Sequence, residues 1–397
     1  MRINTGYIKI GPVAKKIMRN ILRNSRVSCG KYVAYFEELY AKKHNVKYAI
    51  TVGSGTEADY LSLLALKERG ILKEGDEVIV PASCFISVAN AVTLAGMKPV
   101  FVDTDPFNMN LDDLKDTITD RTKAIIAVHF GGLPLDMNYL KEIAGDIPII
   151  EDCACAHGTI ANNQIAGSHG LLSTWSLYVA HIVSAGGGGV IGTNDDKLAK
   201  FIYSLRAYGR NCICRPCIAN TTGQRCKKRF SNGVDMRFLY NKIGINSRMT
   251  EMEAAIGIDQ MEIYDEIIKK RVNNFLKLKQ ELILVIGQKI ITTFPHKKSP
   301  EYLVSPIFFP IILSDSINRN RVTAYLESKG VETRPLYACI PTQQPVYQNH
   351  FQAKEKFPMA EKMGKQGFYV GIHQGLTQED IIFLAEQIVS AIEEAMK

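Results

Sequence analysis

The sequence predicts an α/β fold in which a mostly parallel sheet lies between helices, followed by a smaller C-terminal α+β domain. Short apolar strands alternate with amphipathic helices from about residue 47 to residue 209, which is typical of a parallel sheet covered on both faces. A second group of strands and helices follows a long helical segment that begins near residue 248. Because 397 residues suit one large domain plus a smaller one, we expect domains over residues 1–260 and 261–397.

The individual elements follow from the hydrophobic patterns. Residues 1–45 have a helical pattern of mixed charge. We expect strands of the large domain at 47–53, 77–83, 98–104, 123–130, 147–154, 173–178 and 188–193. We expect helices of the large domain at 53–70, 85–96, 111–118, 136–145 and 195–209. In the small domain we expect strands at 304–313 and 331–336, and helices at 320–330 and 377–397.

Composition argues against several classes of protein. The net charge is +8, from 48 Lys and Arg residues against 40 Asp and Glu residues, and this mild excess suits an anionic substrate. The basic residues are dispersed and form no patch with interleaved aromatic residues, so we expect no nucleic-acid binding. No apolar run could span a bilayer and no signal peptide opens the chain, so we expect a cytoplasmic protein without membrane contact. Nine cysteines without an export signal indicate metal or redox chemistry where they cluster.

The stretch 173–189, STWSLYVAHIVSAGGGG, is the most informative part of the chain. It predicts a strand, a polar turn that contains His181, and four consecutive glycines from Gly186 to Gly189. A single histidine in an apolar segment is more often a satisfied core residue. The glycines favour a functional interpretation, because a backbone without side chains can closely approach a ligand or another strand. The end of a strand is also where α/β enzymes place their chemistry.

A loop between an expected strand and an expected helix contains the second candidate site. Ser54, Gly55 and Thr56 combine small side chains and two hydroxyl groups with the free N–H groups of a helix N-terminus, which suits a phosphate. An ordinary helix cap by Ser54 or Thr56 explains the same residues equally well.

Three further residues have both a functional and a structural interpretation. Asp152 ends an apolar strand, where its carboxylate could pair with a buried cation or cap the next turn. Phe85 follows another strand and could stack on a planar ring, although a core aromatic is the commoner explanation. Ser176 lies five residues before His181, where its hydroxyl could bind phosphate or make a local hydrogen bond.

The order and spacing of these pieces resemble the DegT/DnrJ/EryC sugar aminotransferases, which are pyridoxal phosphate enzymes of fold type I. The matching segments run from CGKYVAYFEELYAKKHNVKYAITVGSGTEA through FGGLPLDM, EDCACAHG and INSRMTEMEAAIGIDQM to KFPMAEKMGKQGFYVGIHQGLTQEDI. The resemblance implies the fold type I architecture and a homodimer with shared active sites.

The resemblance also implies a role for each candidate cofactor residue. Residues matching Ser54, Gly55, Thr56 and Ser176 hold the cofactor phosphate in the family. The residue matching Phe85 stacks on the cofactor ring. The residue matching Asp152 pairs with the ring nitrogen, so that the ring stays protonated and accepts electrons. The residue matching Asn246 reaches the phosphate of the neighbouring subunit, and Cys155 stands where the family has a side chain near the ring oxygen.

The chain departs from the family at position 181. The family's lysine, which binds the cofactor covalently, is replaced here by His181, and an imidazole cannot form that bond. A minority branch of 3-dehydratases has histidine at this position. These enzymes act on nucleotide-linked 4-keto-6-deoxyhexoses with dissociable pyridoxamine phosphate. The resemblance therefore implies that His181 is the general base that removes a proton from the cofactor methylene before the C3 hydroxyl leaves. An imidazole with an ordinary pKa of about 6.5 would suit that step.

The cysteines refine the resemblance. Thiolate clusters suggest zinc or an iron–sulfur centre, and the segment 211–230 resembles that of the iron–sulfur CDP-4-keto-6-deoxyglucose 3-dehydratases. The position that should provide the fourth ligand is Ala154, with a cysteine on either side. The expected metal ligands are Cys153 (or its neighbour Cys155), Cys212, Cys214, Cys217 and Cys226.

Three functions are compatible with these observations. The first is a pyridoxamine phosphate-dependent, iron–sulfur 3-dehydratase that receives electrons from a reductase partner. The second is a dehydratase or an aminotransferase-like enzyme without a redox cluster. The third is a regulatory or scaffolding protein that binds the cofactor without catalysis. The cysteine segment argues against the second function, and the retained cofactor residues argue against the third.

Overall fold

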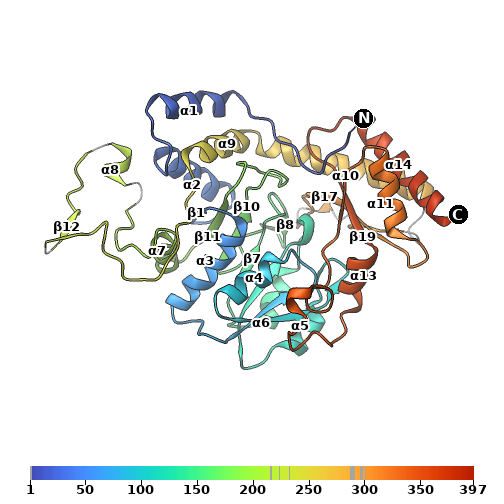
Figure 1. The fold of residues 1–397 in the computed structure, drawn as a ribbon, viewed down its shortest axis with the longest axis horizontal. Helices are drawn as coiled ribbons and strands as arrows, with labels where there is room; N and C mark the ends of the chain where they lie inside the picture. The colour runs from blue at the N-terminus through green and yellow to red at the C-terminus, as the bar shows by residue number, and fades with distance from the viewer. Residues whose placement is uncertain are drawn as a thin grey trace.

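A seven-stranded sheet forms the centre of the larger part of the molecule in the computed structural model (Figure 1). The structure describes residues 2–214, 217–222, 224–231, 233–286, 291–295, 298–299 and 301–397. The strand order is β1-β11-β10-β7-β6-β2-β3. The strands are β1 (Tyr48–Val52), β2 (Glu77–Pro81), β3 (Lys98–Val102), β6 (Thr122–Val128), β7 (Ile149–Asp152), β10 (Leu172–Ser176) and β11 (Gly189–Thr193).

All neighbouring pairs from β10 to β3 are parallel, whereas β11 is antiparallel to both β1 and β10. Parallel neighbours need a crossover connection, usually a helix, and antiparallel neighbours need only a turn. No helix separates β10 from β11, so the chain reverses directly through the segment 177–188. The expected mostly parallel sheet is therefore confirmed, with one reversed strand next to His181.

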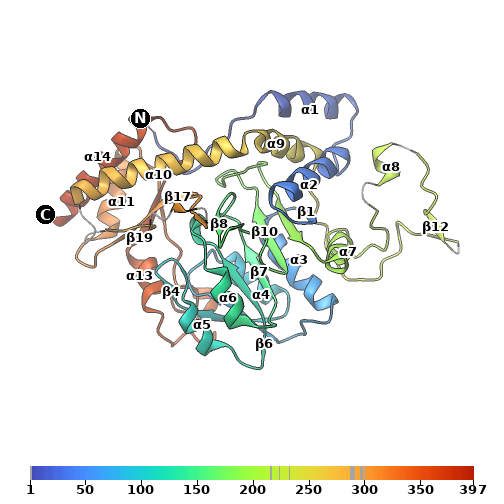
Figure 2. The same cartoon turned by 180° about the vertical axis from the view of Figure 1, so that it is seen from behind.

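Helices cover both faces of this sheet, as the two opposite views show (Figures 1 and 2). Their sequences contain the apolar stripes that predicted them, and these stripes are buried against the strands. The helices are α2 (Lys31–Lys43), α3 (Gly55–Glu68), α4 (Ser87–Leu94), α5 (Leu111–Thr117), α6 (Met137–Ala144) and α7 (Asp196–Leu205).

The N-terminal helix and two consecutive long helices lie along one side of the sheet. They are α1 (Pro12–Arg23), α9 (Glu251–Glu262) and α10 (Tyr264–Ile286). The sequence predicts a single helix from about residue 248, but the helix starts later and is interrupted at Ile263. The hydroxyl of Thr250 caps α9 in a reciprocal arrangement with Glu253, which explains the later start.

A second sheet with the order β14-β17-β19-β18 follows α10, and all of its pairs are antiparallel. This sheet and its helices form the expected α+β part, and both chain ends lie beside it (Figure 1). The placement of the domain boundary at residue 260, inside α9, stays a prediction. The main elements are β14 (Ile291–Thr292), β17 (Phe308–Leu313), α11 (Arg319–Ser328), β18 (Thr333–Pro335), α13 (Pro358–Gln366), β19 (Gly367–Gly371) and α14 (Gln378–Met396).

The cysteine-bearing segment extends away from the rest of the molecule in both views (Figures 1 and 2). In its described residues it contains only a short helix, α8 (Ile218–Thr221), and a small hairpin of β12 (Phe230–Ser231) and β13 (Val234–Asp235). Within the described part of the chain, no helix combines the length and the apolar character that crossing a membrane requires.

Candidate active site

Several of the predicted cofactor residues lie at one edge of the seven-stranded sheet. Strand β7 ends at Asp152 and β10 ends at Ser176, and these two strands are parallel neighbours. The antiparallel strand β11 begins opposite Ser176, at Gly189. Because the carboxyl ends of parallel strands share one edge, the loops that follow them enclose a common site, as in open α/β sheets generally.

The N-terminus of α3 is packed closely against the end of β10. A Cβ atom added to Gly55 would lie 2.9 Å from Cβ of Ser176, and one added to Gly189 would overlap the carbonyl oxygen of Ser54. The hydroxyl of Ser54 caps the helix by accepting a hydrogen bond from the N–H of Glu57, at 3.1 Å. Both interpretations of this loop therefore hold at the level of geometry. Ser54 is a helix cap, and the glycines permit a close backbone approach.

The donors at this helix end remain available to a ligand. The first-turn N–H groups of Gly55 and Thr56 have no carbonyl one turn earlier in the helix to bond. Among the described residues, the hydroxyl of Ser176 accepts a single long hydrogen bond, of 3.4 Å, from the N–H of Tyr178. Two N–H groups, two hydroxyls and the positive end of a helix dipole match the chemistry of a phosphate group.

Asp152 is buried at the end of β7. One of its oxygens accepts a hydrogen bond of 2.8 Å from the N–H of Ala154. Burial raises its pKa to about 6, while that hydrogen bond and the nearby His129 lower it. Within the described residues, no Lys, Arg or His makes an ion pair with this carboxylate. A buried carboxylate without a cationic partner suits a ligand that itself provides a protonated ring nitrogen.

His181 lies in the turn after β10, where its backbone N–H donates a hydrogen bond to the carbonyl of Tyr178 at 2.9 Å. Its Nδ1 is 4.0 Å from Sγ of Cys155, and the Ala154 backbone is within hydrogen-bonding reach of the ring. Burial and, to a smaller extent, the cation of Arg271 lower the pKa of His181 to about 4, against the opposing effect of the Ala154 backbone. The expected pKa near 6.5 is therefore wrong for this half-buried ring, because the sequence does not reveal which groups pack around it.

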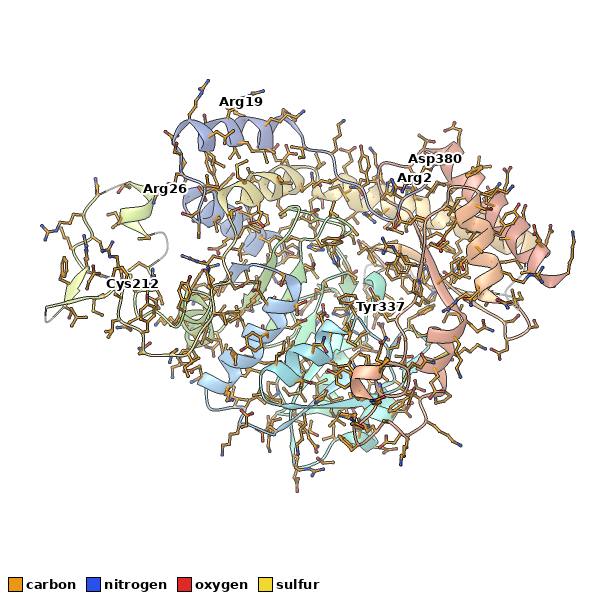
Figure 3. The ribbon with its side chains drawn as sticks, viewed as in Figure 1. Arg2, Arg19, Arg26, Cys212, Tyr337 and Asp380 are labelled. Atoms are coloured by element: carbon orange, nitrogen blue, oxygen red, sulfur yellow. The ribbon has the colours of Figure 1, made fainter. Side chains whose placement is uncertain are left out.

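Phe85 lies in the loop before α4 rather than in the helix itself, and 57% of its side chain is exposed. Its ring centre is 5.8 Å from that of Tyr337, in an edge-on arrangement. The core interpretation of Phe85 is thus wrong, and an exposed ring face at the site is free to stack. Tyr337, which Figure 3 labels, is a site residue that the sequence pattern did not single out.

Asn246 is exposed, and its side chain accepts a hydrogen bond from Arg248 at 2.8 Å. The next residue, Ser247, is buried and accepts a hydrogen bond of 2.8 Å from the N–H of Gly53, in the loop before α3. Sequence reasoning missed Ser247, and its position beside Asn246 was the available signal. Ser247 fixes the loop before α3, while Asn246 lies at the surface.

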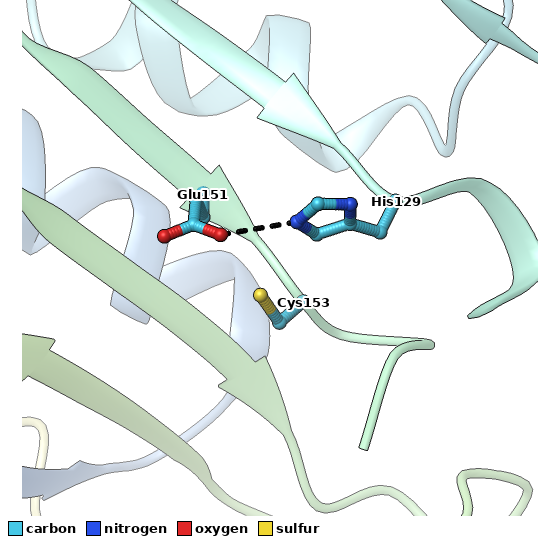
Figure 4. Close-up of side chains that lie close together, drawn as sticks. All are labelled: His129, Glu151 and Cys153. Atoms are coloured by element: carbon cyan, nitrogen blue, oxygen red, sulfur yellow. Dashed lines mark hydrogen bonds and ion pairs between the residues drawn. The ribbon is translucent and has the colours of Figure 1, made fainter. Parts of the chain in front are cut away.

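Cys153 belongs to a buried group with His129 and Glu151, whose nearest polar atoms lie within 4.8 Å of one another (Figure 4). Nδ1 of His129 accepts a hydrogen bond from the N–H of Leu135, so Nε2 carries the proton and donates to Glu151 at 3.1 Å. The ring has no free lone pair for a metal. Glu151 also accepts hydrogen bonds from three backbone N–H groups. Burial raises its pKa, but His129, His169 and the N–H of Gly167 together lower it below its ordinary value. The group is a satisfied structural network.

The structure does not bring the predicted metal ligands together. Cys153 is fully buried in the core, whereas the segment with Cys212 projects outward on one side (Figure 3). Cys155 lies beside His181. Within the described ranges, no group of three potential metal ligands includes any of Cys212, Cys214, Cys217 or Cys226. The charges of Cys214 and Cys217 do act on Cys212, whose pKa is raised mainly by burial, so these three thiols are neighbours.

The geometry matches one class of protein, an α/β enzyme that binds a phosphorylated cofactor at the carboxyl edge of its sheet. Residues 9–392 match the DegT/DnrJ/EryC1/StrS aminotransferase family, and the chain belongs to this family. It is an enzyme with the fold of type I pyridoxal phosphate-dependent aminotransferases.

Two curated relatives cover nearly the whole chain. The lipopolysaccharide biosynthesis protein RfbH of Salmonella typhimurium is 31% identical over 97% of this chain and 90% of its own length. A GDP-perosamine synthase of Escherichia coli O157:H7 is 32% identical over 91% of this chain and 90% of its own length.

Solved structures of a GDP-4-keto-6-deoxymannose-3-dehydratase share the fold. A histidine-to-asparagine variant of that enzyme with bound GDP-perosamine has a TM-score of 0.87 and 27% identity, covering 98% of this chain and 100% of that chain. The Escherichia coli enzyme with bound hydrated pyridoxal phosphate has a TM-score of 0.86 and 27% identity, covering 98% and 99%.

Proposed function

We propose that the protein is a pyridoxamine phosphate-dependent 3-dehydratase of a nucleotide-linked 4-keto-6-deoxyhexose. The observation that carries this proposal is His181, which occupies the position of the family's lysine in a site that otherwise retains its cofactor residues. An imidazole can accept and return a proton but cannot form the covalent bond that a lysine amine forms with the cofactor. The relatives named above include a sugar 3-dehydratase and a GDP-perosamine synthase, and His181 favours the dehydratase.

Each part of the site has a role in this proposal. The N-terminus of α3, together with Ser176, would hold the cofactor phosphate, and the exposed ring of Phe85 would stack on the cofactor ring. Asp152 would pair with the ring nitrogen, because it is buried and its pKa of about 6 leaves it ionised at neutral pH. Cys155, 4.0 Å from His181, would line the side of the ring oxygen.

His181 would act as the general base. When bound, the cofactor supplies a primary amine and an electron-accepting ring, which together activate a hydroxyl group next to a ketone. With a pKa lowered to about 4, the imidazole is neutral at pH 7 and able to accept a proton. Because Nδ1 faces Cys155, Nε2 is the nitrogen that would take it. Such a base typically contributes about 10²–10⁴-fold to the rate.

Product analysis tests this proposal directly. The purified protein is incubated with pyridoxal phosphate, glutamate and 4-keto-6-deoxyhexoses linked to GDP, CDP or dTDP. The proposal predicts a sugar that has lost its C3 oxygen. A product that keeps this oxygen and carries an amine at C4 would identify an aminotransferase instead.

A second candidate adds an iron–sulfur cluster that receives electrons from a reductase. It is supported by the proximity of Cys212, Cys214 and Cys217, since thiolates are the usual ligands of such clusters. Iron and acid-labile sulfide are measured in protein purified without oxygen. Iron and sulfide in equal amounts support the cluster, whereas zinc without sulfide, or no metal, leaves the dehydratase without redox chemistry.

We also propose that the enzyme is a homodimer. Exposed apolar side chains are concentrated in the part of the chain that leads to Asn246, and such patches commonly mark protein interfaces. They are Tyr208, Phe238, Leu239, Tyr240 and Ile243. Light scattering at micromolar concentration should give twice the mass of the chain, and a monomer at all concentrations would exclude shared active sites.

A further inference from the structure

Helix α3 connects the phosphate end of the site with a second buried carboxyl group. Gly55, at the start of α3, lies against Ser176 of β10. Asp59 follows four residues later, so it projects from the same side of the helix one turn farther on. There, one of its oxygens accepts a hydrogen bond of 2.6 Å from the hydroxyl of Thr174, two residues before Ser176 on the same strand. The helix therefore lies along β10 and touches it at two successive positions.

Thr174 is also the strand neighbour of Asp152. The two residues are paired across the parallel strands β10 and β7, and the N–H of Cys153 donates to the carbonyl of Thr174 at 2.8 Å. Paired residues of adjacent strands project from the same face of the sheet. Asp59, Thr174 and Asp152 thus form a row on one face of the sheet, which ends at the proposed cofactor residue Asp152.

Two carboxyl groups in this row are buried, with side chains of Asp59 and Asp152 only 3% and 7% exposed. Burial and the charge of Asp152 raise the pKa of Asp59 well above its ordinary value. The other titratable groups here are the thiols of Cys84 and Cys153, whose pKa values burial also raises, and His129, which acts on Asp152. No described Lys or Arg forms an ion pair with Asp59, and the hydrogen bond from Thr174, which lowers its pKa, does not outweigh burial and the charge of Asp152.

We propose that Asp59 is a positioning residue for Asp152, held as a neutral acid that fixes Thr174 and leaves Asp152 as the single ionised carboxylate of the row. This inference rests on the proposed cofactor role of Asp152 and adds a residue to it. A carboxyl group that must stay neutral beside one that must be charged is a known way in which active sites assign roles to two acids.

The first test needs no cofactor. Melting temperatures of the full-length protein are compared from pH 4.5 to pH 8.5 for the native chain and Asp59→Asn. An ordinary aspartate has a pKa of about 3.9 in an unfolded chain, so keeping Asp59 protonated in the folded state costs more stability as the pH rises. The amide oxygen of the variant would keep the acceptor for Thr174 without that cost. We therefore expect Asp59→Asn to melt higher than the native protein at pH 8, with the difference shrinking toward pH 4.5.

Asp259→Asn is the matched control. Asp259 is also a buried helical aspartate, but it accepts hydrogen bonds from two backbone N–H groups, those of Gly11 and Ala14. This variant should melt lower than the native protein at pH 8. If Asp59→Asn behaved like this control, Asp59 would be an ionised structural residue and the inference would be overturned.

The second test measures positioning. Asp59→Leu has a similar size but leaves the hydroxyl of Thr174 without its acceptor. We expect Asp59→Leu to bind pyridoxal phosphate at least tenfold more weakly than the native protein, and Asp59→Asn to restore the affinity. Affinity is measured by absorbance at a temperature where the variant is folded. A purely structural role would lower the melting temperature of Asp59→Leu and leave the affinity unchanged. If the native protein does not bind pyridoxal phosphate, the proposed function fails, and the melting experiment still decides the state of Asp59.

Discussion

At the scale of single residues, the chemistry of the site depends on how burial changes the pKa values of ordinary side chains. The sequence placed Asp152 at the end of one apolar strand and His181 after another, and the structure places both at the same edge of the sheet. Their pKa values could not be predicted, since these depend on neighbours distant in the chain, such as Arg271 for His181. Asp59 and Ser247 were missed for the same reason. Their significance comes from contacts with Thr174 and Gly53, which no local pattern reveals.

The pKa of Asp152 gives a prediction for cofactor binding. Because only the ionised carboxylate pairs with a protonated ring nitrogen, affinity for pyridoxal phosphate should be constant above a pH of about 6 and fall below it. The expected decrease approaches tenfold per pH unit. Absorbance titrations between pH 4.5 and pH 8 measure it, with Asp152→Asn as a control that should bind weakly throughout. An affinity that does not change with pH in the native protein would show that Asp152 does not pair with the cofactor.

At the scale of elements, the alternation of strands and helices predicted the large sheet because parallel strands need helical crossovers. The pairing of β11 between β1 and β10 could not be predicted, since a hydrophobic pattern does not identify the neighbour of a strand. The same limit applies to the cysteine segment. Its spacing suggested one metal site with Cys153, yet Cys153 follows a central strand and is buried in the core.

The contact between α3 and β10 gives a prediction at this scale. In Gly55→Ala the new methyl group would lie 2.9 Å from Cβ of Ser176, so the helix end must move away from the strand. Overpacking of this kind costs about 1–3 kcal/mol. We expect a lower melting temperature and at least tenfold weaker binding of pyridoxal phosphate.

Gly187→Ala is the matched control, because its added methyl group meets nothing nearer than 3.5 Å. This substitution should have little effect on the melting temperature or on the affinity for pyridoxal phosphate. Equal effects of the two substitutions on cofactor affinity would show that the close approach of α3 and β10 has no special importance.

At the scale of the whole molecule, buried histidines connect parts of the chain that are distant in sequence. His44, at the end of α2, bonds the hydroxyl of Tyr264 on α10 at 3.1 Å. His157, after β7, bonds the hydroxyl of Tyr40 on α2 at 2.8 Å. Both rings are fully buried, and burial lowers the pKa of His44 to about 3 and that of His157 well below its ordinary value. The fold therefore requires both histidines to be neutral.

This requirement predicts a specific loss of stability in acid. Below a pH of about 6.5 the histidines of the unfolded chain bind protons that the folded chain excludes, so unfolding becomes easier as the pH falls. Each such group contributes about 1.4 kcal/mol per pH unit until its folded pKa is reached. Urea unfolding at several pH values between 7.5 and 5 measures the effect. The raised pKa values of Asp59 and Asp152 act in the opposite direction, so the native protein is compared with a variant. His44→Gln should lose less stability than the native protein between pH 7.5 and pH 5, and an equal change in both proteins would contradict the account.

The most direct test of the central claim is solvent deuterium exchange at the methylene group of pyridoxamine phosphate, with native protein and His181→Asn in parallel. The variant should bind the cofactor and the sugar nucleotide, because Asp152, Ser176 and the start of α3 are unchanged. The account predicts a rate of exchange about 10²–10⁴-fold lower at an unchanged melting temperature. Exchange at the native rate in a folded variant would show that His181 is a packing residue and not the base.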